Sequence, residues 1–227
     1  MILALQIVLA AAYALLAHGA SAGDDARLAL AALWVLVALV FAAPLLHGRP
    51  WAFVLAAASA AGAWWLYQRG LAALPLLLVP VLFVALVAWL FGRSLRAGRV
   101  PLINRIVSGL DGVPPEQLPA DVAAYARRLT AAWAGVLALL GLANLVLALL
   151  ASPGGLLAQA GIASPWPVTH TQWSWFANLL NYGLVGGFFV LEFQYRRHRF
   201  PGRDGGFFSF LRRMGGLGPA FWRDFLR

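Results

Sequence analysis

Six long apolar stretches constrain the fold of this chain more than any other feature of its sequence. Each approaches the roughly 20 residues that a helix needs to cross the hydrocarbon core of a membrane. Of all residues, 62% are hydrophobic and only 11% are charged, a balance that a soluble domain could not bury. The sequence therefore predicts an all-α, polytopic transmembrane helix bundle with six spans, at Ile2–Ala17, Leu28–Leu46, Trp51–Tyr67, Leu71–Phe91, Ala131–Ala151 and Trp175–Phe193.

The basic residues are distributed unevenly between the two sides of this predicted bundle. All 17 are arginine, and two of them, Arg27 and Arg69, fall in loops on one side. The other 15 fall in the turn after Leu46, in the stretch Gly92–Thr130 and in the tail. Arginine near the end of a span resists translocation. Both termini and Gly92–Thr130 are therefore predicted to be cytoplasmic.

Composition and motifs weigh against several functions. The positive charge is confined to stretches where topology already explains it, so anionic lipid headgroups are the expected counter-charge, and nucleic acid is not. The chain has no cysteine, which excludes disulfides and a cysteine nucleophile. Its four histidines are dispersed, and there is no G-x-S-x-G elbow or phosphate-binding loop. We therefore predict no catalytic residue, metal site or cofactor, although an enzyme is not excluded.

The apolar and basic segments divide the chain into four parts. Residues 1–91 form a four-span half, 92–130 a basic cytoplasmic loop, 131–195 a two-span half and 196–227 a basic tail. The loop supplies the candidate docking surface for cytoplasmic proteins, formed by Arg93, Arg96, Arg105, Arg127 and Arg128.

Helical periodicity is present inside the loop and the tail. After Pro101, four apolar residues recur at helical spacing opposite Asn104, Arg105 and Ser108, which predicts a short amphipathic helix on the membrane surface. The tail alternates aromatic and basic residues and is predicted to form similar interfacial helices. From about Pro119 no breaker precedes the fifth span, so one long helix is expected there.

A polar stripe follows one face of the sixth predicted span. Its members are spaced three or four residues apart, and the fifth span adds one more amide. A polar group in hydrocarbon is costly, so such residues are candidates for a substrate groove. The alternative is that they only form interhelical hydrogen bonds, with Glu192 meeting Arg196 or Arg197 at the interface. The candidate residues are Asn144, Asn178, Asn181, Glu192 and Tyr195.

Several motifs between about Phe91 and Pro201 are distinctive, namely Phe91–Arg96, Pro101–Arg105, Leu118–Arg128 with Trp133, Asn178–Tyr182, Glu192–Arg197 and Phe200–Pro201. In these motifs the chain resembles an uncharacterised family of bacterial inner-membrane proteins. That family is encoded among aryl-polyene (xanthomonadin-type) pigment genes, and some members carry the label "ketosynthase", which this cysteine-free chain does not fit. The resemblance implies an accessory role in aryl-polyene lipid biosynthesis and no established catalytic residue.

Three functions remain open from the sequence. The first is a non-catalytic inner-membrane protein that docks cytoplasmic polyene enzymes or handles the lipid product. The second is a small lipid transporter or flippase, which needs polar residues meeting in a central cavity. The third is a membrane acyltransferase-like enzyme. Membrane lipids and cytoplasmic biosynthetic enzymes are the expected partners, and the oligomeric state is left open.

Overall fold

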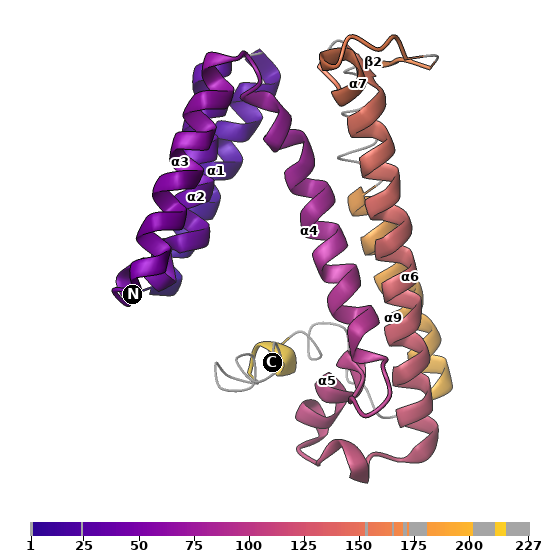
Figure 1. Ribbon diagram of the computed structural model, residues 1–227. Coiled ribbons are helices and arrows are strands. Elements are labelled where there is room, and N and C mark those ends of the chain that lie inside the picture. Colours follow the sequence, from indigo (N-terminus) through magenta and orange to yellow (C-terminus); the bar gives the residue numbers. More distant parts are fainter. Residues whose placement is uncertain are drawn as a thin grey trace. The chain divides into compact units, whose positions relative to one another are not determined.

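The computed structural model describes residues 2–23, 25–152, 154–164, 166–169, 172, 181–201 and 212–216. Within these ranges the chain is mostly helical (Figure 1). In chain order the elements are α1 (Ile2–Gly23), α2 (Ala26–Leu46), α3 (Pro50–Gln68), α4 (Ala73–Ser94), α5 (Leu102–Asp111), η1 (Pro115–Gln117), α6 (Ala120–Leu150), β1 (Ala151–Ser152), α7 (Leu156–Gln159), β2 (Val168–Thr169) and α9 (Asn181–Arg199).

Four of the described helices are long and apolar enough to cross a membrane, namely α1, α2, α4 and α6. They coincide with four of the six predicted spans, although α1 continues past Ala17 to Gly23. Helix α3 is not among the four, because its tryptophans, Ser59 and Gln68 make it less apolar. The predicted sixth span lies partly outside the described residues, which resume at α9.

The chain divides into two compact units, and the first comprises residues 1–80 and 147–168. Its helices α1, α2 and α3 lie side by side (Figure 1). Small side chains at their contacts, such as Ala20, Ala29 and Ala63, are buried and let the helices approach closely. The indole of Trp34 donates to the carbonyl oxygen of Ala60 at 3.2 Å. Close packing of small side chains and the hydrogen bond of Trp34 thus hold α2 against α3.

The second unit comprises residues 81–146 and 169–227, and α6 is its longest helix. The prediction of one continuous helix into the fifth span is confirmed, because α6 runs unbroken over 31 residues. At about 1.5 Å per residue it is roughly 46 Å long, longer than a hydrocarbon core. Gly141 lets α4 come close, since a Cβ there would lie 3.7 Å from Val84 and 3.8 Å from the backbone nitrogen of Ala85.

Helix α5 confirms the short helix predicted after Pro101, and it ends where Gly112 adopts a left-handed conformation with φ of 67°. The sequence pattern did not predict which side of α5 packs against the rest of the protein. Asn104 and Ser108, on its polar side, are buried, and the Asn104 side-chain amide donates to the carbonyl of Ala123 at 3.1 Å. The polar side of α5 therefore packs against the protein, where the Asn104 amide and the Ser108 hydroxyl donate to the backbone carbonyls of Ala123 and Val113.

The first turn of α5 is capped by side chains from two other helices. The amide of Leu102 donates to Ser94 Oγ at 3.1 Å, and the amide of Ile103 donates to Thr130 Oγ1 at 3.2 Å. These are two of the amides that a helix start leaves without a partner. The contacts fix α5 to the end of α4 and to the early part of α6.

Candidate functional site

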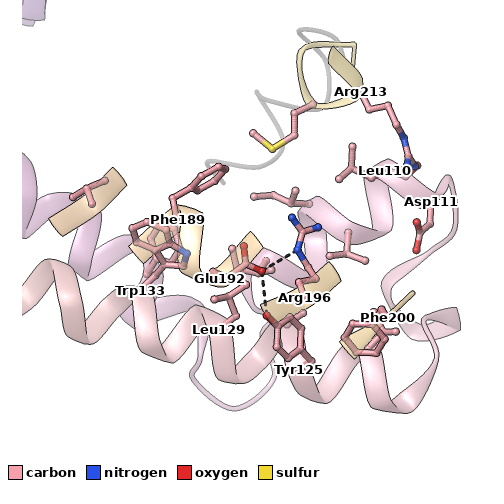
Figure 2. Close-up of a pocket in the computed structure, with 18 of the residues that line it drawn as sticks. Leu110, Asp111, Tyr125, Leu129, Trp133, Phe189, Glu192, Arg196, Phe200 and Arg213 are labelled. Carbon is pink, nitrogen blue, oxygen red and sulfur yellow. Dashed lines mark hydrogen bonds and ion pairs between the residues drawn. The ribbon is translucent and has the colours of Figure 1, made fainter. Parts of the chain in front are cut away.

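A cavity of about 350 Å³ lies among α4, α5, α6 and α9 within the second unit (Figure 2). This volume falls in the range of roughly 300–1,000 Å³ that is common for small-molecule sites. Most of the side chains around it are aliphatic or aromatic. The apolar lining consists of Val87, Phe91, Ile103, Ile106, Val107, Leu110, Val122, Ala126, Leu129, Trp133, Leu137, Val185, Phe189, Phe200 and Met214.

The cavity is elongated along α6. Its wall on this helix is formed by Tyr125, Leu129, Trp133 and Leu137, which are four residues apart and so share one face. At about 1.5 Å per residue, Tyr125 and Leu137 are roughly 18 Å apart along the axis.

Helix α9 runs antiparallel to α6. The ring of Trp133 meets Phe188 edge-on with centroids 4.7 Å apart, whereas Tyr125, earlier on α6, stacks on Tyr195 at 6.0 Å. Tyr125 also meets Phe200 at 5.4 Å. The two helices therefore pack on each other, and α9 adds Val185, Phe189, Glu192 and Arg196 to the cavity lining.

Beside Tyr125 the cavity is lined by a polar cluster, and the lining continues beyond this cluster to Phe200, Asp111 and Arg213 (Figure 2). The Tyr125 hydroxyl donates to Glu192 Oε1 at 3.1 Å, and Arg196 Nε lies 2.9 Å from the same oxygen. Only 7% of the Glu192 side chain and 15% of the Arg196 side chain are exposed. Burial raises the pKa of Tyr125, which precedes the predicted fifth span, and the Glu192 charge raises it further. The phenol therefore stays protonated and serves as a donor.

Two further charged residues line the cavity near the end of α5. Asp111 and Arg213 are both exposed there. Arg213 Nη2 donates to the carbonyl oxygen of Leu110 at 2.6 Å, a favourable place for a cation because the last carbonyls of a helix carry partial negative charge. The helical turn 212–215 thus meets the end of α5.

No known protein family, curated protein or solved structure matches this chain. Function is therefore argued from the geometry of the site. In the part of the chain that the structure describes, no three His, Cys, Asp or Glu side chains are grouped to hold a metal ion.

The predicted polar stripe is only partly brought to this site. Glu192 lines the cavity, and Tyr195 stacks on Tyr125 with 60% of its surface exposed. Asn144 is buried, and its amide donates to the Leu140 carbonyl at 2.8 Å. It lies about 28 Å along α6 from Tyr125 at 1.5 Å per residue and does not line the cavity.

Two members of the stripe cannot be placed. Asn178 lies outside the described residues, and of Asn181 only the backbone, the first residue of α9, is described. A shared groove between these amides and Asn144 therefore stays a prediction.

The predicted docking arginines differ in their exposure. Arg96, Arg127 and Arg128 are exposed, whereas Arg93 and Arg105 are half-buried. The Arg93 guanidinium lies 4.8 Å from the centroid of the Trp89 ring, and Arg127 donates to the Leu95 carbonyl at 3.0 Å. Three of the five are thus open to a partner.

Sequence reasoning found one part of the polar cluster and missed the rest. The alternative interpretation of the stripe predicted that Glu192 meets Arg196 or Arg197, and in the structure Glu192 pairs with Arg196. Tyr125 was not predicted as its third member, because it lies 67 residues away along the chain. The regular recurrence of Tyr125, Leu129, Trp133 and Leu137 was the available signal for a shared wall.

Proposed function

We propose that the chain is an integral protein of the bacterial inner membrane that serves the assembly of aryl-polyene lipids by handling a lipid intermediate or product. The observation that carries this proposal is the largely apolar cavity whose lining includes the polar cluster of Tyr125, Glu192 and Arg196. Apolar walls with a few convergent polar groups are typical of binding sites for amphiphilic molecules. A hydrocarbon chain would lie along α6, and its headgroup would meet the polar cluster.

The proposed topology gives this ligand the orientation of a membrane lipid. We propose six spans with both termini in the cytoplasm, in keeping with the arginine distribution. Tyr125 precedes the fifth span, so the polar cluster around it would lie at the cytoplasmic interface. Leu137 would lie within the hydrocarbon. A lipid made in the cytoplasmic leaflet could enter without reversing its direction.

The resemblance to the pigment-associated family supplies the pathway. Its motifs include Tyr125, Trp133, Glu192 and Arg196, and all four line the cavity. The residues that carry the resemblance therefore coincide with the residues that carry the proposed site.

A second candidate function is docking of cytoplasmic biosynthetic enzymes. The observation that favours it is the exposure of Arg96, Arg127 and Arg128, which would attract an acidic protein surface. Docking and lipid handling are compatible, but they predict different defects when the protein is missing.

Deleting the gene and fractionating the pigment intermediates distinguishes the two. Lipid handling predicts that lipid-linked polyene accumulates in the inner membrane, because synthesis continues and the product is not passed on. Docking predicts that carrier-bound intermediates accumulate in the soluble fraction. Unchanged amounts and distribution of pigment would contradict both functions.

A further inference from the structure

Four charged residues line the cavity, two acidic and two basic. Glu192 and Arg196 form an ion pair with little exposed surface, whereas Asp111 and Arg213 are exposed. No other Asp, Glu, Arg or Lys of the described chain lines the cavity. Its lining therefore carries no net formal charge, in contrast to the strongly basic chain as a whole.

The ion pair of Glu192 and Arg196 is expected to act most strongly on the charge of a bound headgroup. Its side chains are 7% and 15% exposed, so water screens them little, whereas Asp111 and Arg213 are exposed at the surface and are screened. A further charge placed beside a balanced buried pair would lose its hydration without gaining a net counter-charge, which is costly.

We infer that the cavity binds a single-chain amphiphile whose headgroup has no net charge and forms hydrogen bonds, such as an alcohol, ester or amide. This rests on the proposed function, namely that the cavity holds an amphiphile. The Arg196 guanidinium has donor chemistry, whereas the Tyr125 oxygen, whose proton is donated to Glu192, and the Glu192 carboxylate have acceptor chemistry, which matches such a headgroup. The volume of about 350 Å³ is at the lower end of common ligand sites and favours one chain over two.

Tryptophan fluorescence of the purified full-length protein in detergent tests the inference. The probes are a monoacylglycerol and an alkyl methyl phosphate that carry the same brominated chain, the first uncharged and the second permanently anionic. Bromine quenches an indole on contact, and Trp133 lies in the cavity wall. The quenching lost in Trp133→Phe is assigned to the cavity, since the other nine tryptophans are present in both proteins.

In the unaltered protein, we expect the uncharged probe to quench Trp133 with a Kd at least about tenfold lower than that of the anionic probe. Glu192→Gln leaves the charge of Arg196 unbalanced and is expected to shift the preference at least about tenfold toward the anionic probe. Arg196→Gln is expected to shift it the other way. Glu116→Gln, the same change as in Glu192→Gln at an exposed position outside the cavity, should leave it unchanged.

The outcomes separate this inference from the proposed function. Equal or tighter binding of the anionic probe in the unaltered protein would overturn the uncharged headgroup and leave the amphiphile site standing. If neither probe quenches Trp133, the cavity holds no amphiphile and the proposed function loses its carrying observation. With Trp133→Phe as the reference, the comparison in the unaltered protein decides even where the Glu192 or Arg196 variant fails to fold.

Discussion

Glu192 shows how a single residue serves both the fold and the site. Its carboxylate accepts from Tyr125 on α6 and pairs with Arg196 one turn further along α9. A buried ion pair adds little stability compared with a well-packed apolar pair, but loss of one partner leaves an uncompensated charge. Stability alone therefore does not explain the pair, in keeping with its proposed role at a ligand headgroup.

A double-mutant cycle tests this coupling. Glu192→Ala and Arg196→Ala should each lower the free energy of unfolding by about 3–5 kcal/mol, because each strands a buried charge. The double variant should lose clearly less than the sum of the two. Unfolding in mixed micelles by a denaturing surfactant measures all four proteins, and additive losses would show that the two side chains are independent.

At the scale of elements, α5 is held by side chains that lie outside it. The hydroxyl groups of Ser94 and Thr130 accept hydrogen bonds from the backbone amides of Leu102 and Ile103. This arrangement places Ile103, Ile106 and Val107 in the cavity wall. The position of this wall therefore depends on two hydroxyl groups.

Ser94→Ala and Thr130→Ala should each destabilise the start of α5 by about 1 kcal/mol, the usual cost of losing a helix cap. Hydrogen exchange at the Leu102 and Ile103 amides should accelerate in the corresponding variant. Ser59→Ala, at an exposed position on α3, serves as the control and should leave these amides unchanged. Equal exchange in all variants would mean that the caps do not hold α5.

The contact between α4 and α6 gives a second prediction about elements. Gly141→Ala should be tolerated, because its Cβ would sit at ordinary contact distance from Val84. Gly141→Leu should cost about 1–3 kcal/mol by overpacking. Gly135→Leu is the matched control, since nothing lies within 4 Å of a Cβ there. Thermal unfolding in detergent compares them, and an equal loss in the two leucine variants would contradict this packing.

The parts of the fold that depend on neighbouring residues could be predicted from the sequence, whereas contacts between distant residues could not. The continuous α6 and the short α5 follow from local periodicity and from the absence of breakers. The sequence also predicted, as one alternative, that Glu192 meets Arg196 or Arg197, and the ion pair forms with Arg196. The meeting of Tyr125 with Glu192 depends on how α6 packs on α9, which periodicity does not specify.

At the scale of the whole molecule, the arginine asymmetry predicts the topology. Reporter fusions after Gly70 and Gly161 should read periplasmic, and fusions after Gly112 and Arg227 should read cytoplasmic, because 15 of 17 arginines fall on one predicted side. A periplasmic signal at Gly112 would place Tyr125, Glu192 and Arg196 on the periplasmic side. A lipid made in the cytoplasmic leaflet could not then reach them with its headgroup, and the topology would be wrong.

The most direct test of the central claim is to fill the cavity and measure pigment and protein together. Leu129 lines the cavity, whereas Leu139 on the same helix has 70% of its surface exposed. Leu129→Trp should lower the pigment made per molecule of membrane protein, because the indole occupies the space of the ligand chain, and Leu139→Trp should leave it unchanged. Normal pigment per molecule in Leu129→Trp would contradict a lipid site in this cavity.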